Sequence, residues 1–287
     1  MTKIHFNRIT ILGVGLIGAS FARAMKKNGF CDHITGFGRN TSNLINAVER
    51  GIIDSFESDP ALACEDADMI MFSTPVGSFT NLAEKSRPAF KKGSIVTDVG
   101  SVKGNLVYEM ERLMPEGVHY IGGHPIAGSD HSGIDSSNAE LFRNAKYIIT
   151  PTENSEAGAL ETVSGVWRSL GSNVLTMTPE KHDRIYAAVS HLPHIIAYAI
   201  VNAVAEIDNS YLGFCGQGFK DTTRIASSPP ELWRDISLLN RDNLIESISI
   251  FRKNLDMLEH YLSTSDAEAL EGEFKKARAL RDGIGPN

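Results

Sequence analysis

The sequence lacks a surplus of basic residues. Its 28 lysines and arginines are outnumbered by 35 aspartates and glutamates, which gives a formal net charge of −7. Proteins that bind nucleic acid usually carry a basic face, and anionic membranes attract basic segments, so this balance disfavours both partners. A local basic patch would still suit an anionic small molecule, and a small-molecule substrate is the partner that we expect.

Cysteine is scarce, and its three copies (Cys31, Cys64 and Cys215) are too widely spaced for a disulfide framework or a cysteine–histidine metal site. We therefore expect free thiols, a reducing compartment and no metal. The N-terminus has no apolar signal sequence, and we expect no segment long enough to span a bilayer. Together these absences predict a cytoplasmic protein.

A glycine-rich turn follows the first predicted strand. The β-branched run at residues 9–12 leads into Gly13-Val14-Gly15-Leu16-Ile17-Gly18, and a predicted helix continues to about residue 28. In dinucleotide-binding proteins the first glycine allows a tight turn, the second lets backbone approach the pyrophosphate, and the third packs helix on strand. Leu16 and Ile17 would open the helix whose amides hold the phosphates. The competing interpretation is a purely structural turn.

The second predicted strand, at residues 33–37, indicates the type of cofactor. NAD-dependent enzymes usually place an acidic residue at its end to hold the ribose hydroxyls. This chain has Gly38-Arg39-Asn40 there. Nothing in that tripeptide would repel a 2′-phosphate, and Arg39 could pair with one. We therefore expect NADP in preference to NAD, although Arg39 could equally be a solvated loop charge.

Strands and helices alternate as far as residue 177. This alternation predicts an α/β fold, with a doubly wound parallel sheet of the Rossmann type over residues 1–177. From residue 178 the apolar spacing is only helical, which predicts an all-α domain over residues 178–287. The amphipathic region at residues 242–281 offers more apolar surface than one small domain needs, so we expect a homodimer formed by the helical domain.

Several polar residues follow predicted strands at the carboxyl edge of the sheet, where ligands of such sheets collect. Ser73-Thr74-Pro75 ends one strand, and Ser101 follows the next at the start of a helix, where it could instead be only a cap. His124 ends a third strand, between Gly122-Gly123 and Pro125. A histidine at this edge, with a pKa near neutrality, is a candidate base for hydride transfer.

The helical half contains two further polar clusters. His191 and His194 flank Pro193, which is expected to kink a long apolar helix. A buried histidine there could also be an ordinary core residue. Downstream, Lys220-Asp221-Thr222-Thr223-Arg224 is densely charged, and an arginine suits bidentate pairing with a substrate carboxylate.

Five motifs in this order make the chain resemble the prephenate/arogenate dehydrogenase family of tyrosine biosynthesis. The resemblance extends over almost the whole length, and the glycine motif alone would be weak evidence for it. The motifs are Gly13–Gly18, the segment from Thr97 to Gly104, the segment from Gly123 to Gly128, the segment from Ser190 to His194, and the segment from Phe219 to Ala226.

The resemblance implies a reaction and a set of roles. His124 matches the histidine that takes the proton of the ring hydroxyl as hydride leaves for nicotinamide, and Ser101 matches a serine that assists there. Arg224 matches an arginine that pairs with a substrate carboxylate, and His191 a histidine in the same pocket. Lys220 and Asp221 match an ionic network near the dimer-related site. Ser129-Asp130 stands where the family often has Thr-Glu, so a substrate contact is expected at Ser129 and a gating contact by Asp130 is in doubt.

The expected activity is NAD(P)-dependent oxidative decarboxylation of prephenate to 4-hydroxyphenylpyruvate. The alternative is an arogenate or dual-specificity cyclohexadienyl dehydrogenase, because the two substrates differ only by a keto or amino group. An imine or β-hydroxyacid reductase would typically use a lysine in the helical domain or lack the loop at His124. A non-catalytic nicotinamide-sensing protein is a further alternative.

Overall fold

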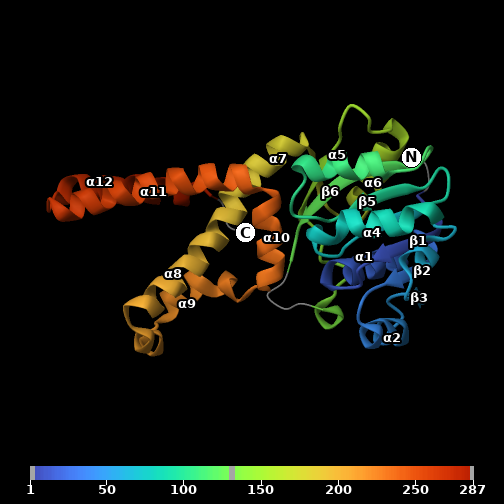
Figure 1. Cartoon of the computed structure of the whole chain (residues 1–287), viewed down its shortest axis with the longest axis horizontal. Coiled ribbons are helices and arrows are strands. Elements are labelled where there is room, and N and C mark those ends of the chain that lie inside the picture. Colours follow the sequence, from blue (N-terminus) through green and yellow to red (C-terminus); the bar gives the residue numbers. More distant parts are fainter. Residues whose placement is uncertain (1–3, 129–132, 285–287) are drawn as a thin grey trace.

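The computed structural model describes residues 4–128 and 133–284 of the chain. An eight-stranded sheet with helices on both faces occupies the first part, and every element after it is helical (Figure 1). The strands are β1 (Phe6–Leu12), β2 (Cys31–Phe37), β3 (Ser55–Glu57), β4 (Met69–Phe72), β5 (Ile95–Asp98), β6 (His119–Ile126), β7 (Lys146–Thr150) and β8 (Asn173–Thr176). The predicted fold class is confirmed.

The helices have the following bounds. Those of the sheet region are α1 (Leu16–Lys27), α2 (Thr41–Glu49), α3 (Pro60–Cys64), α4 (Phe79–Ser86), α5 (Gly104–Leu113) and α6 (Ala157–Ser169). Those of the helical region are α7 (Pro179–Tyr186), α8 (Leu192–Asp208), α9 (Gln217–Thr223), α10 (Pro230–Leu239), α11 (Arg241–Ser263) and α12 (Ala267–Asp282). Local capping explains several starts: Asn40, Asp59 and Thr178 each accept a bond from a first-turn amide of the helix that follows.

The strand order is β3-β2-β1-β4-β5-β6-β7-β8. The chain moves outward from β1 to β3 and then returns to place β4 on the other side of β1. This reversal leaves a crevice at the carboxyl ends of β1 and β4, where doubly wound sheets bind nucleotides. Gly13 follows β1 and Ser73 follows β4, so the two motifs meet at the crevice.

One strand pair departs from the expected parallel sheet. β6 pairs in parallel with β5 through Ile121, and from Gly122 to Ile126 it pairs antiparallel with β7. Parallel neighbours need a crossover, usually through a helix, but the described residues between β6 and β7 contain no α-helix. The segment between β6 and β7 therefore returns at the edge of the sheet where β6 ends, and β7 runs antiparallel to β6. His124 lies inside β6, beyond the end of β5, and not at the end of a strand as expected.

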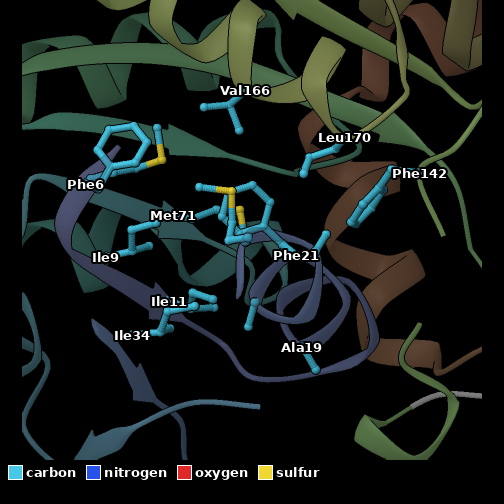
Figure 2. Close-up of a cluster of buried hydrophobic side chains, with 14 of the residues drawn as sticks. Phe6, Ile9, Ile11, Ala19, Phe21, Ile34, Met71, Phe142, Val166 and Leu170 are labelled. Carbon is cyan, nitrogen blue, oxygen red and sulfur yellow. The ribbon is translucent and has the colours of Figure 1, made fainter. Parts of the chain in front are cut away.

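Two hydrophobic cores lie on the two faces of the sheet. One joins α1 and α6 to the sheet through side chains such as Phe21 and Trp167, and Figure 2 shows part of it. Trp167 stacks on Tyr147, with ring centroids 4.0 Å apart. The other core joins α4 and α5 to the opposite face and includes Trp233 of α10. The second core therefore also fixes the helical region against the sheet.

The helical region extends away from the sheet. Figure 1 shows α11 and α12 as one arm, and α8 with α9 as a second arm. The expected kink near Pro193 takes the form of a π-helical segment, Ala187–His191, between α7 and α8. A proline lacks the amide that would bond to the preceding turn, and wider turns are one way to accommodate this loss.

The helical run Pro179–Phe214 is long and apolar enough to cross a membrane by length and composition alone. The expectation that no segment would reach this length was therefore wrong. Only 17% of its most apolar window is buried inside this single chain. Its apolar side chains consequently form an unpartnered surface.

Candidate active site

The glycine turn has the geometry that a dinucleotide needs. Gly13 has a φ of +112°, and a Cβ there would lie 2.6 Å from the backbone carbonyl carbon of Ser73. A Cβ on Gly18 would lie 2.2 Å from the carbonyl oxygen of Gly13, so both positions require glycine. No atom lies within 4 Å of the corresponding point on Gly15. Gly15 precedes α1 without a side-chain cap, so the first amides of α1 are available to an anion.

A cavity of about 820 Å³ opens at this crevice. It collects eight of the predicted site residues from both halves of the chain: Gly15, Leu16, Ile17, Ser73, Thr74, Pro75, Ser101 and Arg224. The hydroxyl of Ser73 is buried and has no hydrogen-bond partner among the described residues. A buried hydroxyl of this kind fits a polar ligand such as a nucleotide, because its own hydrogen bond is still unmade.

Other predicted residues lie elsewhere. Arg39 is exposed after β2, and Lys220 is exposed on α9. Gly13 and Gly18 shape the turn behind the cavity, and the lining among the described residues does not include His124 or His191. Ser129 and Asp130 lie outside the described residues.

His124 is partly buried and contacts the helical region directly. Its Nδ1 lies 2.8 Å from Nε2 of His182 in α7, and the two ring centroids are 5.1 Å apart. Nδ1 of His182 lies in turn 2.8 Å from Oδ1 of Asp183. The ring of Tyr186 packs against both histidines. A base candidate on the sheet is therefore connected to a buried carboxylate on a helix.

A buried ion pair fixes the strand ends beside His124. The ammonium of Lys103 binds the carboxylate of Asp98 and the carbonyl oxygen of Gly123, the latter at 2.9 Å. The hydroxyl of Tyr120 donates to Asp98 Oδ2 at 2.5 Å, and the Gly100 amide donates to Oδ1 at 2.6 Å. Because a buried charge is costly unless it is fully paired, this network holds β5, β6 and the loop before α5 in one arrangement.

Burial lowers the pKa of His124 well below its ordinary value, with the neighbouring His182 as the second cause. The imidazole is therefore neutral at pH 7 and has a lone pair that can accept a proton. Burial also lowers the pKa of His191 to about 4. Both histidines are uncharged in the resting protein.

His191 and His194 occupy different surroundings. His191 is 1% exposed, and its Nδ1 lies 3.1 Å from Nδ2 of Asn240. His194 lies in the cavity wall and stacks on Trp233, with centroids 3.4 Å apart. The sequence favoured His191 as the pocket residue, whereas the described cavity lining includes His194 and does not include His191.

Sequence reasoning assigned no role to the polar residues that bond to His124, to its neighbours or to each other: Asp98, Lys103, His182, Asp183 and Asn240. Two signals were available. Asp98 is a charged residue at the end of a buried strand at the carboxyl edge. His182-Asp183 lies on an amphipathic helix that begins after the cap Thr178. Which of these residues faces the sheet depends on the docking of α7 and could not be read from spacing.

A glycine turn at a crevice, a cavity between sheet and helices, and a neutral histidine at the carboxyl edge of the sheet define a nicotinamide-nucleotide-dependent dehydrogenase of two regions. Comparison with known proteins identifies the family. The model described as "Prephenate dehydrogenase, nucleotide-binding domain" matches residues 21–176, and "Prephenate dehydrogenase, dimerization domain" matches residues 178–276. The chain belongs to the prephenate dehydrogenase family, as the five motifs indicated.

Individual relatives agree over nearly the full length. Prephenate dehydrogenase of Bacillus subtilis is 34% identical over 96% of this chain and 76% of its own length. Cyclohexadienyl dehydrogenase of Zymomonas mobilis is 32% identical over 96% of this chain and 95% of its own length. The crystal structure of prephenate dehydrogenase from Aquifex aeolicus with hydroxyphenyl propionate and NAD+ is 37% identical, with a TM-score of 0.92 over 97% of this chain and 98% of that one.

Proposed function

We propose that the protein is a prephenate dehydrogenase, which converts prephenate to 4-hydroxyphenylpyruvate and carbon dioxide with reduction of NAD(P). The observation that carries the proposal is the neutral, partly buried His124, held at the carboxyl edge of a nucleotide-binding sheet in a chain of this family. The alternative is activity on arogenate, alone or together with prephenate. The cyclohexadienyl dehydrogenase among the relatives supports keeping that alternative.

Each step of the reaction has a candidate residue. His124 accepts the proton of the substrate's ring hydroxyl as hydride leaves the ring carbon that bears this hydroxyl. Ser101, in the cavity wall, forms a hydrogen bond with the same hydroxyl. The nicotinamide supplies the hydride acceptor. Once the carbon is a carbonyl, loss of carbon dioxide and return of a proton to the oxygen give an aromatic phenol. Aromatisation makes the overall step effectively irreversible.

Substrate binding requires fixed cations, because prephenate carries two carboxylates. Arg224 lies in the cavity wall and is proposed to pair with one of them. His194 shares that wall, so it is proposed to contact substrate, with the buried His191 supporting it from behind. Lys220 and Ser129 remain proposed substrate contacts.

Gly13, Gly15, Leu16, Ile17, Gly18 and the segment Ser73-Thr74-Pro75 are proposed to hold the dinucleotide. NADP is proposed as the preferred form, because β2 ends at Phe37 and Gly38-Arg39-Asn40 follows without a carboxylate. The exposed Arg39 would pair with the 2′-phosphate. Arg39→Ala is expected to raise the Kd for NADP and leave that for NAD unchanged. Equal loss of both would remove Arg39 from this role.

The two halves, residues 1–177 and 178–287, are proposed to act as a nucleotide-binding domain and a helical substrate and dimerisation domain. A homodimer is supported by the exposed apolar side chains of the helical region, which include Ile207, Phe214, Leu262 and Phe274. A cytoplasmic location is supported by the three cysteines, all of which are free thiols.

The test of the proposed function is the His124→Gln variant in steady-state assays with prephenate and arogenate. Loss of a general base typically costs a factor of about 10² to 10⁴, so kcat is expected to fall by that amount. The Kd for the cofactor, measured separately, should stay within a few-fold of the wild type. Turnover near the wild-type rate would refute the base. Normal cofactor binding by a wild type that turns over neither acid would favour a cofactor-sensing protein.

A further inference from the structure

Three side chains form a hydrogen-bonded series that connects the sheet to the helical region, and His124 is the first of them. His124 lies on β6, and His182 and Asp183 lie on α7. The hydrogen-bond distances along it are 2.8 Å from His124 Nδ1 to His182 Nε2, and 2.8 Å from His182 Nδ1 to Asp183 Oδ1. His182 is fully buried and Asp183 is 3% exposed, so water does not compete for these bonds.

The carboxylate of Asp183, at the end of this series, determines which nitrogens of the two histidines carry protons. Burial raises the pKa of Asp183 to about 6, so the carboxylate is ionised at pH 7 and only accepts hydrogen bonds. Nδ1 of His182 must therefore carry a proton and donate it to Asp183. Burial lowers the pKa of His182 to about 2, so its ring is neutral and its other nitrogen, Nε2, has no proton. Nε2 of His182 is therefore an acceptor, and Nδ1 of His124 must donate to it. A neutral His124 with its proton on Nδ1 has its lone pair on Nε2.

We propose that His182 and Asp183 are positioning residues that fix the tautomer of His124, so that Nε2 is the nitrogen that takes the substrate proton. This proposal builds on the proposed dehydrogenase function and adds the residues that orient its base. When His124 Nε2 gains the proton, the ring becomes an imidazolium with both nitrogens protonated. The acceptor on His182 and the negative charge of Asp183 then stabilise the new positive charge.

Asp183 is held in place from two directions. Its Oδ1 also accepts from the backbone amide of Lys103 at 2.7 Å, directly before α5. Its carbonyl oxygen accepts from Nδ2 of Asn240 at 2.8 Å. The carboxylate is therefore fixed to the loop that carries Ser101, and the backbone of Asp183 is fixed to Asn240, the residue before α11. Only the docked arrangement of sheet and helical region gives His124 the correct tautomer.

Charged neighbours do not replace Asp183 in this role. The ammonium of Lys103 lies close enough to disfavour positive charge on both histidines, and it is already paired with Asp98. Glu180, one turn earlier on α7, accepts instead from the hydroxyl of Tyr108 on α5, at 2.6 Å. This second contact between α5 and α7 supplies a matched control, since it joins the same helices without touching His124.

The experiment measures the tautomer and the kinetics in parallel. In protein with ¹⁵N-labelled histidine, NMR is expected to show His124 protonated on Nδ1 and bare on Nε2. His182→Phe keeps a ring but removes the acceptor, so the His124 proton should redistribute toward Nε2. For Asp183→Asn and His182→Phe we expect kcat to fall about 10²-fold or more, as for other disrupted orienting groups, with KM for substrate and Kd for cofactor within about threefold of wild type.

Tyr108→Phe is the control, and its kcat and His124 tautomer should remain those of the wild type. A wild-type His124 protonated on Nε2 would overturn the proposal. So would a His182→Phe variant that folds and retains kcat within threefold. If Asp183→Asn does not fold, the wild-type spectrum and His182→Phe still decide. A wild type inactive on both prephenate and arogenate would refute the proposed function instead, and the NMR measurement would still test the tautomer.

Discussion

The sheet region and the helical region treat their apolar side chains differently. The sheet region buries nearly all of them in two cores, and its exposed large apolar residues are Ile45, Leu62 and Leu175. Among residues 178–284 six apolar residues are buried, namely Tyr186, Ala187, Ala197, Trp233, Ile236 and Leu244. A much larger set is exposed there, including Ile207, Phe214, Leu262 and Phe274.

This contrast shows which region buries its apolar side chains within one chain and which requires a second surface to cover them. The sheet region closes its own core and has the buried aromatic stacking of an independently stable unit. The helical region extends as two arms that cannot bury their apolar faces within one chain (Figure 1). Contiguous exposed apolar surface of this kind marks an association site. The proposed active site lies where the two regions meet, because His124 comes from one and His182 from the other.

The largest expected effect comes from placing charge on the helical arms. Ile207 and Phe214 are 73% and 86% exposed. Burying one large apolar side chain contributes about 1.5–3 kcal/mol, so Ile207→Asp combined with Phe214→Asp should weaken association by roughly 10²- to 10⁴-fold. Analytical ultracentrifugation measures the dissociation constant.

The control is Ile45→Asp on α2, an apolar-to-acidic change at an exposed site of the sheet region. It should leave the association constant unchanged. A double variant of the arms that associates as tightly as wild type would show that this surface is not the dimer interface.

The next effect concerns the sheet core. Trp167 is 1% exposed and contacts Phe21, Phe142 and Tyr147. Trp167→Ala is expected to lower the free energy of unfolding by about 3–5 kcal/mol, because it removes buried surface and leaves a cavity. Denaturant titration gives this value. Leu175→Ala, at a residue 43% exposed, should cost no more than about 0.5 kcal/mol. Equal costs for the two variants would contradict the contrast between core and surface.

The smallest effect is a displaced pH profile. The base must be neutral to accept a proton, and burial between the two regions lowers the pKa of His124. His124 itself therefore stays unprotonated as pH falls below the ordinary histidine value of about 6.5. The acidic limb is expected where Asp183, whose pKa burial raises to about 6, gains a proton and loses the charge that orients His182 and His124. The midpoint of the acidic limb in a plot of kcat/KM against pH gives the pH at which activity is lost. A midpoint at or above 6.5 would show that His124 is solvated in the free enzyme.

Local patterns made much of this molecule predictable. The turn at Gly13–Gly18 could be predicted because strand, glycines and helix are adjacent in the chain and their geometry is set locally. The alternation of strands and helices gave the sheet for the same reason. Ser73-Thr74-Pro75 and Ser101 were brought together in one cavity, since parallel strands share a carboxyl edge, whereas His124 is not in its described lining.

Features set by tertiary docking were not predictable. The antiparallel β7 depends on the path of the chain after Ile126 and not on the composition of the strand. His191 and His194 are three residues apart and both rings contact Trp233, but only His194 is in the described cavity lining, which depends on how α8 packs against the sheet region. His182 and Asp183 acquire a role because α7 docks beside β6, which no local pattern records.

The central claim is tested most directly by following the wild-type protein with prephenate and NADP or NAD. Reduced nicotinamide, carbon dioxide and 4-hydroxyphenylpyruvate should appear in equal amounts, and the same assay with arogenate would yield tyrosine if that substrate is also accepted. Absence of turnover with either acid and either cofactor, in protein that binds the cofactor, would contradict the account.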